Sequence, residues 1–580
     1  MQIKIKAGFA GGTLAAPPSK SMAHRALLCA ALANGQSRVA GICASDDMLA
    51  TMRAMRALGA RIVYDADTGS ALVHGAGTQL CGGDGVAASV LPPVTCGDGA
   101  GAQLCGGGAG AQLCDGAGAA ASVLPPVTCG GGAGAAASVL PPVDCGESGS
   151  TLRFVIPLFA LSGASVTLTG QGRLPERPQG VYADLFAARG LLFAQSGTGI
   201  TLRGPLPAGE YAVDGSVSSQ FISGLLFALP LLDGDSVIRI APPFESRSYV
   251  DLTLRAMADF GVHAAWENEF TIRIKGNQKY SACHYTVEGD CSQAAFFAVL
   301  AACLPEHAAT TAGARTAGFS PKGHAAFSAR ISGGEDALSA CPGAVTLTNL
   351  RADTLQGDRV IFSVLQRCGA RLSRGADGSV SVHPSRERLR AADIDLTDCP
   401  DLGPVLMVLG LFCTGETVLR GAGRLRLKEC DRIAAMQCEV QKLGGKISVQ
   451  KDADGGDTVR VRGAGTQDGA GAQGSAGAQD GAGAQGGAGT QDGAGTQGGA
   501  GTQDGASALH ASFALEGHGD HRIVMALCVA ALAAGFSADC TMSGAEAVSK
   551  SYPHFFDDLR ALGAAIEWIE GAPAHEESNT

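Results

Sequence analysis

The first stretch of the sequence that could do chemistry is the start of a predicted helix. A pair of prolines precedes Ser19, Lys20 and Ser21, and an apolar run follows. Proline is tolerated just before a helix and serine caps the first turn, so this pattern predicts a helix that begins here. The free amides of that turn, together with Lys20, Ser21 and Arg25, suit a phosphate or a carboxylate. An ordinary capped helix with surface charges is the alternative.

Five further apolar helices are predicted, each with polar residues at its head. These heads lie at residues 147–151, 218–220, 288–290, 398–401 and 519–522. A helix that is apolar nearly all round belongs in a core, so the six heads are expected to share one end of the structure. The alternative is that the polar residues only cap their helices, above all Glu288 and Asp290.

Charged loops supply a second set of candidates. The loops at residues 174–178, 426–432 and 548–553 carry Arg177, Lys428, Glu429, Arg432 and Lys550. With the helix heads they would form two facing rims of lysine, arginine, serine and carboxylate. Such rims suit a small substrate with several phosphates and carboxylates, because a guanidinium group binds a planar anion through two hydrogen bonds. For any single arginine, a solvated surface position is the alternative.

The elements that would position these residues recur six times along the chain. Each unit has a β-branched strand, a polar loop, an amphipathic helix and a glycine turn into another strand. The turn glycines are Gly59, Gly190, Gly261, Gly369, Gly444 and Gly563. The intervals from Gly190 to Gly261 and from Gly369 to Gly444 are short and similar, whereas the other three are longer. We therefore expect one repeated unit with three insertions.

The expected insertions cover residues 75–139, 304–342 and 463–506. The first repeats an Ala-Ser-Val-Leu-Pro-Pro-Val segment, the second is mixed in composition, and the third repeats Gly, Ala, Gln and Asp. The composition of the third cannot bury enough apolar surface to order a chain, so disorder is the prediction there. Residues 571–580 are expected to form a tail.

Composition limits the kinds of partner. At 580 residues, 46% of them hydrophobic, the chain exceeds one core, so at least two domains are expected. The net charge of −11 argues against nucleic acid or an anionic membrane as partner. The first residues lack the apolar core of a signal peptide, so we expect a cytoplasmic protein. The 19 cysteines show no metal-ligand spacing, and reduced thiols are the prediction.

The ordered motifs resemble those of the 5-enolpyruvylshikimate-3-phosphate synthase family. The matching segments lie at residues 19–25, 149–153, 176–178, 214–220, 400–401, 428–432, 520–522 and 550–553. The resemblance implies an α/β fold, a two-domain inside-out α/β barrel of the enolpyruvyl transferase type, with six βαβαββ-type units, three per domain. One domain would comprise residues 1–16 and 289–570, and the other residues 17–288.

The resemblance also implies a reaction in aromatic amino-acid biosynthesis, without metal or cofactor, by a monomer. The enolpyruvyl group of phosphoenolpyruvate would pass to the 5-hydroxyl of shikimate 3-phosphate, with release of phosphate. Asp401, Glu429 and Lys20 would be catalytic. Shikimate 3-phosphate would be bound by Lys20, Ser21, Arg25, Ser218, Ser219, Gln220, Ser246, Tyr249, Asp401 and Lys428. Phosphoenolpyruvate would be bound by Lys20, Gly149, Arg177, Gln220, Arg432, Arg522 and Lys550. Domain closure around the substrates would exclude water, so an open cleft is expected without them.

The sequence departs from the family pattern in a few places. Glu147 stands where many members have asparagine, and an acidic group there could weaken anion binding unless it points away. Cys430 replaces a more usual threonine or serine, and Arg247 with Ser248 replaces a Lys-Pro pair. Two alternatives stay open: an enolpyruvyl transferase that acts on a UDP-sugar, and an inactive anion-binding relative.

Overall fold

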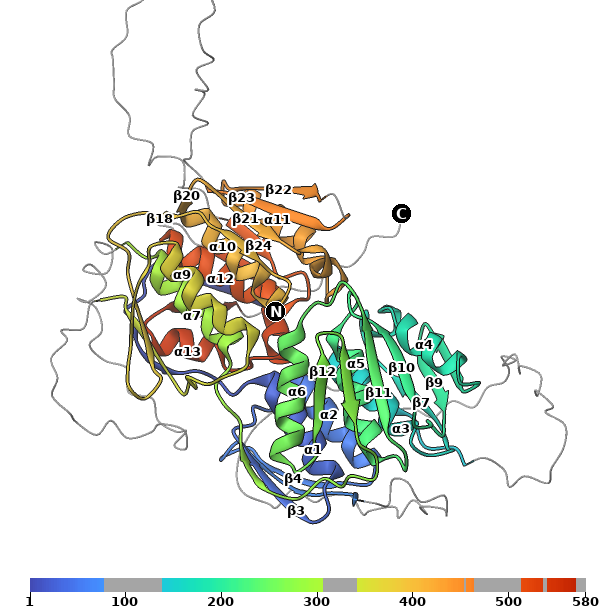
Figure 1. Ribbon diagram of the computed structural model, residues 1–580. Helices are drawn as coiled ribbons and strands as arrows, with labels where there is room; N and C mark the ends of the chain where they lie inside the picture. The colour runs from blue at the N-terminus through green and yellow to red at the C-terminus, as the bar shows by residue number, and fades with distance from the viewer. Residues whose placement is uncertain (78–137, 306–341, 453–454, 464–512, 536–539, 570–580) are drawn as a thin grey trace, which may run out of the picture.

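The computed structural model describes residues 1–77, 138–305, 342–452, 455–463, 513–535 and 540–569. Most of the three expected insertions and the 571–580 tail lie outside these residues. The described residues form two hydrophobic clusters. One cluster gathers residues between Met22 and Val287, and the other joins Ile3 to Ala16 with Cys291 to Ile566. Figure 1 shows the corresponding two lobes side by side, which we call the blue-green lobe and the yellow-red lobe.

The described residues contain six four-stranded sheets with one common strand order. In each sheet, a parallel pair is extended by two antiparallel strands. In the blue-green lobe the sheets are β14(His284–Thr286)-β3(Gln36–Ala40)-β5(Ser70–His74)-β4(Arg61–Asp65), β6(Val143–Asp144)-β7(Ser165–Thr169)-β9(Gly199–Arg203)-β8(Leu192–Ser196) and β10(Glu210–Asp214)-β11(Ser236–Ala241)-β13(Thr271–Ile274)-β12(Ala264–Asn268). In the yellow-red lobe they are β2(Gly12–Ala15)-β15(Val345–Thr348)-β17(Val380–His383)-β16(Arg371–Arg374), β19(Asp393–Asp395)-β21(Glu416–Arg420)-β23(Asp457–Arg462)-β22(Lys446–Lys451) and β24(Phe513–Glu516)-β25(Cys540–Ser543)-β1(Gln2–Lys6)-β26(Ala565–Ile569). A short pair, β18(Leu389–Arg390) and β20(Cys413–Thr414), adds to the yellow-red lobe.

Two kinds of helix accompany each sheet. The inner helices are α1(Lys20–Leu32), α3(Gly149–Phe159), α5(Ser219–Ala228), α7(Cys291–Cys303), α10(Gly403–Phe412) and α12(His521–Ala534). The outer helices are α2(Asp46–Ala57), α4(Gly180–Ala187), α6(Arg247–Asp259), α9(Val360–Arg367), α11(Arg432–Lys442) and α13(Phe555–Ala561). Short 3₁₀ helices are η2(Leu174–Glu176), η3(Leu229–Leu231), η4(Gly357–Arg359), η5(Pro400–Leu402), η6(Gly423–Leu427) and η7(Ala545–Lys550).

The inner helices are buried nearly all round because their sequences are apolar on every face. In α7, for example, every residue from Cys291 to Ala302 is buried. The outer helices bury one face only and end at the six turn glycines. Each of these glycines has a positive φ, such as 103° at Gly59 and 87° at Gly563, a conformation that costs other residues energy. The six predicted units are therefore confirmed, and the fold is the predicted α/β arrangement.

The chain passes between the lobes twice. β1 and β2 belong to the yellow-red lobe although they come first in sequence, because β1 pairs with β25 and β26 and β2 pairs with β15. The return passage lies near Glu288, where the Ser19 N–H donates to the Glu288 carbonyl at 2.7 Å. No helix of the described part is long and apolar enough to cross a membrane.

Candidate active site

The heads of the inner helices meet between the two lobes. Ser19 caps α1 by accepting from the Met22 N–H, and the Lys20 N–H donates to the Asp290 carboxylate at 3.1 Å. Asp290 itself caps α7 through the N–H groups of Ser292 and Gln293. Capping therefore accounts for Asp290, and the same carboxylate also joins one helix head to another.

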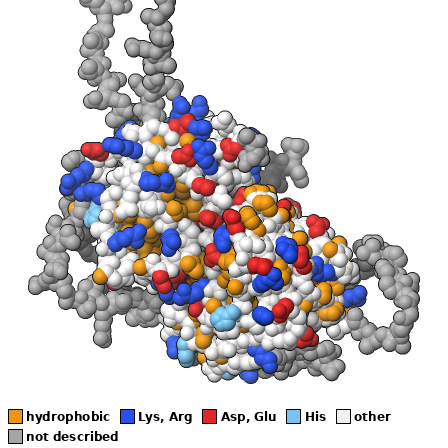
Figure 2. Space-filling view, in the orientation of Figure 1, with side chains coloured by type: hydrophobic (Ala, Val, Ile, Leu, Met, Phe, Trp, Pro, Cys, Tyr) orange, Lys and Arg blue, Asp and Glu red, His pale blue; other side chains and the backbone are white. Residues whose placement is uncertain are grey.

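A cavity opens where these heads meet, and both lobes line it. Its charged residues are eight cations, Lys20, Arg25, Arg153, Arg177, Arg424, Lys428, Arg432 and Arg522, and three carboxylates, Asp47, Asp401 and Glu429. Figure 2 shows acidic and basic side chains interspersed over the face in view, so that face does not share the excess of cations. A concentrated positive charge in a chain of net charge −11 marks a site for small anions.

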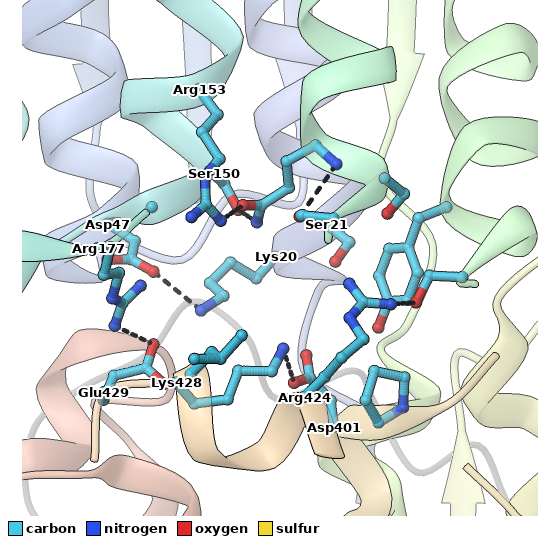
Figure 3. Close-up of a pocket in the computed structure, with 18 of the residues that line it drawn as sticks. Lys20, Ser21, Asp47, Ser150, Arg153, Arg177, Asp401, Arg424, Lys428 and Glu429 are labelled. Carbon is cyan, nitrogen blue, oxygen red and sulfur yellow. Dashed lines mark hydrogen bonds and ion pairs between the residues drawn. The ribbon is translucent and has the colours of Figure 1, made fainter. Parts of the chain in front are cut away.

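All of the predicted site residues except Lys550 line this cavity. Lys550 instead contacts Glu147, which belongs to the other lobe. Figure 3 shows Lys20, Arg177 and Lys428 from different elements directed toward the same space. The sequence thus predicted which residues come together, while their roles toward a substrate stay predictions.

Asp401 lies inside a cage of three cations. Its carboxylate accepts hydrogen bonds from Lys428 Nζ, Arg432 Nη1 and Arg522 Nη2, each at 3.2 Å. Burial alone would favour the neutral carboxyl, but the positive charges of Arg522, Lys428 and Arg432 outweigh it and hold the pKa of Asp401 well below its usual range. Asp401 is therefore ionised in the structure at neutral pH.

Glu429 contacts both lobes. It accepts from Arg432 Nη2 at 2.7 Å and lies 3.3 Å from Arg177 Nη2 of the blue-green lobe. Burial opposes its charge, but Arg432 and Arg177 hold the pKa of Glu429 well below its usual range. Gly149 at the start of α3 makes room for this arrangement, because a Cβ there would lie 2.8 Å from Arg177 Nη1.

Arg432 is the buried centre of the yellow-red side of the cavity. Its side chain is 1% exposed, and Nε donates to Asp520 at 2.8 Å. Burial opposes its charge, yet Asp520, Glu429 and Asp401 raise the pKa of Arg432 above its usual value. A planar guanidinium with three carboxylate neighbours has a fixed orientation, which lysine could not reproduce.

Arg25 holds the opposite wall with neutral acceptors. Its Nε donates to Thr253 Oγ1 at 2.8 Å, while Nη1 and Nη2 donate to the carbonyls of Ser21 and Tyr249. The guanidinium also lies 5.3 Å from the centre of the Phe154 ring. Among the described residues no carboxylate forms an ion pair with Arg25, so its positive charge next to the cavity is not offset there.

Ser246 and Tyr249 join this wall to the yellow-red lobe. Ser246 has a φ of 58° and its N–H donates to the Thr397 carbonyl at 3.0 Å. The Tyr249 hydroxyl donates to Asp358 at 3.0 Å. Burial, reinforced by Asp401, raises the pKa of Asp358 to about 7.

Sequence reasoning gave no role to several residues that line the cavity. Arg153 donates to Gln220 at 2.8 Å, and burial beside Arg177 lowers the pKa of Arg153 to about 9. Arg424 donates to Ser246 Oγ at 2.6 Å. Arg153 follows Gly149 by four residues, one helical turn along α3, so the periodicity could have placed it on the same face.

Asp47 and His521 complete the additional lining. Lys20 Nζ donates to Asp47 Oδ2 at 2.9 Å. His521 is 1% exposed and both of its ring nitrogens are without hydrogen-bond partners in the described part of the chain. Burial, with Lys20 nearby, lowers the pKa of His521 well below its usual value, so its ring is neutral.

Three contacts bridge the cleft between the lobes, and the open cleft expected without substrates stays a prediction. Arg177 with Glu429, Lys550 with Glu147 and the hydrogen bond of 2.8 Å from Ser549 to Asp46 each join the two lobes. Opposite charges on the facing rims attract one another, which accounts for the two ion pairs among these contacts.

The other departures from the family pattern lie near this site or beyond it. The Cys430 thiol lies 3.7 Å from an Asp520 carboxylate oxygen, and burial raises its pKa to about 12, so it is a neutral thiol. Arg247 stacks over the Trp266 ring at 4.1 Å and does not line the cavity. The cysteines that the structure describes are free thiols.

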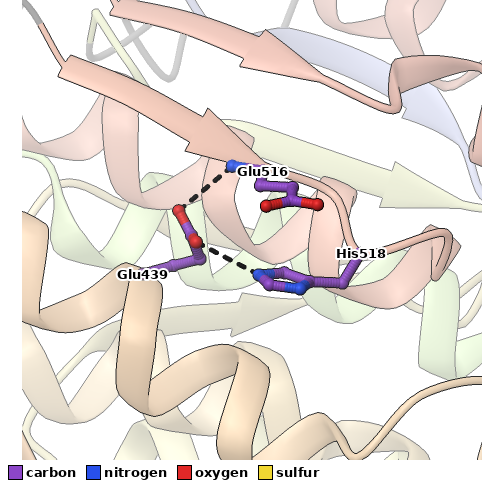
Figure 4. A group of neighbouring side chains, drawn as sticks. All are labelled: Glu439, Glu516 and His518. Atoms are coloured by element: carbon purple, nitrogen blue, oxygen red, sulfur yellow. Dashed lines mark hydrogen bonds and ion pairs between the residues drawn. The ribbon is translucent and has the colours of Figure 1, made fainter. Parts of the chain in front are cut away.

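One group of three possible metal ligands stands out among the described residues, namely Glu439, Glu516 and His518 (Figure 4). The Glu439 carboxylate already has protein partners. It accepts hydrogen bonds from Lys442 Nζ at 2.8 and 2.9 Å and from the Glu516 N–H at 3.0 Å, and it lies 3.1 Å from His518 Nε2. An ammonium on this carboxylate competes with a cation for the same oxygens. We assign Glu439 a structural role, in which it ties the loop before α12 to α11.

Comparisons with known proteins agree with this geometry. The family model described as EPSP synthase (3-phosphoshikimate 1-carboxyvinyltransferase) matches residues 8–107, 129–317, 337–469 and 496–559. The chain is 34% identical to a 3-phosphoshikimate 1-carboxyvinyltransferase of Clostridium beijerinckii and 32% identical to one of Clostridium botulinum, with 98% of this chain and 99% of each relative covered.

Solved structures are similar in fold. An EPSP synthase structure from Acinetobacter baumannii gives a TM-score of 0.60 at 22% identity, covering 98% of this chain and 99% of that one. The enolpyruvyl transferase NikO from Streptomyces tendae gives a TM-score of 0.58 at 15% identity, covering 98% of both chains.

Proposed function

Because this chain belongs to the EPSP synthase family, we propose that it transfers the enolpyruvyl group of phosphoenolpyruvate to the 5-hydroxyl of shikimate 3-phosphate and releases phosphate. The observation that carries the proposal is the cavity between the lobes, where eight cations surround the carboxylates Asp401 and Glu429. The two substrates together bring two phosphates and two carboxylates, which match this excess of cations.

The acceptor side of the site is the wall built around Arg25. Shikimate 3-phosphate contacts Ser21, Arg25, Ser218, Ser219, Ser246 and Tyr249 in this proposal, with Lys428 beside Asp401. Support comes from the serines at the head of α5, where the free amides of a helix start add donors for a phosphate. The neutral acceptors on Arg25 support it further, since they orient the guanidinium without cancelling its charge.

Phosphoenolpyruvate binds on the other side of the cavity in this proposal. Lys20, Arg177, Gln220, Arg432, Arg522 and Lys550 hold it, and Gly149 leaves space for Arg177. Several guanidinium groups near one point can hold a phosphate and a carboxylate through paired hydrogen bonds. These interactions place the enol carbon close to the acceptor hydroxyl and exclude water.

The reaction proceeds by addition and elimination. Asp401 takes the proton of the 5-hydroxyl while the hydroxyl oxygen attacks the enol carbon of phosphoenolpyruvate. A proton is added to the methylene carbon at the same stage. The tetrahedral adduct then loses phosphate together with a proton from the new methyl group, which restores the double bond. Lys20 donates the first of these carbon protons and Glu429, which is ionised, accepts the second.

We also propose a monomer that works in the cytoplasm, and two domains divided at residues 16–17 and 288–289. The change of hydrophobic cluster between Ala16 and Met22 and between Val287 and Cys291 supports the division.

Phosphate release tests the proposed function directly. The purified chain is expected to release phosphate from phosphoenolpyruvate only when shikimate 3-phosphate is present. Release with a UDP-sugar acceptor instead would favour the other enolpyruvyl transferase activity, and no release with either acceptor would favour an inactive relative.

A further inference from the structure

An ion pair between Glu147 and Lys550 joins the two lobes beside the cavity. Glu147 directly precedes Ser148, the N-cap of α3, and Lys550 ends η7. Glu147 Oε2 contacts Lys550 Nζ; the Lys550 side chain is 8% exposed and that of Glu147 is 41% exposed. The Lys550 ammonium is thus mostly enclosed by the protein, while the Glu147 side chain that neutralises it is partly exposed to solvent.

The surroundings place this pair next to the reacting groups. Gly149, two residues after Glu147, lines the cavity, and Lys550 contributes to the lowered pKa of Glu429. A Cβ at Gly172 would overlap Glu147 Oε1, so the carboxylate lies tightly against the backbone there. The Glu147 carboxylate is therefore held at the edge of the anion site.

The neighbouring ion pair of Arg177 and Glu429 also joins the lobes, with the charges the other way round. There the blue-green lobe supplies the cation and the yellow-red lobe the anion, whereas Glu147 and Lys550 reverse these roles. Each pair uses a protein carboxylate to neutralise a cation that otherwise attracts small anions. An anion that binds Lys550 therefore competes with Glu147 for the charge of the same ammonium.

We propose that Glu147 determines the affinity for phosphoenolpyruvate, because its carboxylate occupies Lys550 until an anionic group of the substrate displaces it. The proposal rests on the proposed function and adds a residue that competes with the substrate. Displacement is feasible because the partly exposed Glu147 side chain can turn into water, where its charge is solvated. A phosphate carries more negative charge than a carboxylate, so it wins the exchange at a cost in net affinity.

The central test is the Glu147→Gln variant of the full chain, which keeps the side-chain shape and removes the charge. The KM for phosphoenolpyruvate is expected to fall three- to tenfold, with kcat and the KM for shikimate 3-phosphate changed less than twofold. Inorganic phosphate, used as a competitive inhibitor, is expected to bind more tightly by the same factor. The matched control is Glu210→Gln, which removes the same charge from an exposed pair with Arg239 and is expected to leave every constant unchanged.

A double-mutant cycle separates this role from a merely structural one. Lys550→Met is expected to raise the KM for phosphoenolpyruvate, and adding Glu147→Gln to it is expected to change nothing further. A rise in that KM in the Glu147→Gln variant, or an equal fall with and without Lys550, would overturn the proposal. If the Gln variant does not fold, Glu147→Asp withdraws the carboxylate by one methylene and is expected to lower the KM as well; an unchanged KM there refutes the inference. A wild-type chain that releases no phosphate at all would instead refute the proposed function.

Discussion

The dependence of turnover on pH tests the role of Asp401 most directly. Without substrates, the cage of Lys428, Arg432 and Arg522 holds the pKa of Asp401 well below its usual range, and a carboxylate with so low a pKa is a weak base. Both proposed substrates bring anions to these same cations. Their binding therefore raises the pKa of Asp401 and makes it a better base when the hydroxyl proton must be removed.

The size of the shift follows from simple electrostatics. A unit charge 4 to 8 Å from Asp401 interacts with it by about 2 to 4 kcal/mol at an effective dielectric constant of about 20. One pKa unit corresponds to about 1.4 kcal/mol. Each substrate charge that is not offset by a cation therefore raises the pKa of Asp401 by about 1.5 to 3 units.

Initial rates of phosphate release between pH 4 and pH 9 measure this shift. The acidic limb of kcat/KM reports the pKa of the base in the free enzyme, and the acidic limb of kcat reports its pKa with both substrates bound. We expect the limb of kcat to lie at least one unit higher. Asp401→Asn is expected to lower kcat by about 10²- to 10⁴-fold, with a smaller change in KM. Its pH profile is expected to lack the acidic limb that comes from Asp401, and to keep any limb that comes from ionisation of the substrate phosphates.

Two results would refute the reasoning. One is an Asp401→Asn variant whose kcat stays within fivefold of the wild type, because then Asp401 is not the base. The other is an identical acidic limb in kcat and kcat/KM, because then the substrates do not change the charge around Asp401. Asp393→Asn is the control, since Asp393 forms an exposed pair with Arg420 on the same lobe and is expected to leave both profiles unchanged.

Three further predictions concern local features. Gly149→Ala places a Cβ against Arg177, so the KM for phosphoenolpyruvate is expected to rise about tenfold, an effect of about 1.4 kcal/mol, with the urea midpoint unchanged; an unchanged KM would contradict the close approach. The folded-state pKa of Glu429 is lowered, so its ion pairs stabilise the fold above pH of about 4.3 and are lost as pH falls through the lowered value. The urea midpoint of the wild type is therefore expected to drop more between pH 6 and pH 3 than that of Glu429→Gln, and parallel curves would refute this. Glu439→Gln removes the partner of Lys442 and is expected to destabilise the fold by about 1 to 3 kcal/mol in chemical denaturation, without a change in KM; a lost metal ion in elemental analysis would instead indicate a metal role.

The fold was largely predictable because its unit repeats. Six glycines marked the ends of six outer helices, and each has the positive φ that only glycine adopts at little cost. The exchange of terminal strands between units was not predictable from local patterns. β1 completes a sheet with β25 and β26. These partners lie at the far end of the sequence, and no local periodicity indicates such a pairing.

The site was predictable in its membership and less so in its pairings. Arg177, Asp401 and Arg432 were found because their motifs fall at equivalent places in the unit. The contact of Lys550 with Glu147 instead depends on how two lobes approach each other, which sequence spacing does not encode. Arg424 was missed for a related reason, since it contacts Ser246 across the cleft.

The pairings distinguish the two sides of the cavity in a way that bears on binding. On the proposed phosphoenolpyruvate side, Lys20, Arg177 and Lys550 each hold a protein carboxylate, so a substrate anion there exchanges one ion pair for another. On the acceptor side, Arg25 is held by a hydroxyl and two carbonyls. These neutral groups fix its position without cancelling its charge, so an anion gains the full attraction of a preorganised cation. The protein's own carboxylates therefore weaken phosphoenolpyruvate binding at these three cations, and two of them, Glu429 and Glu147, also join the lobes.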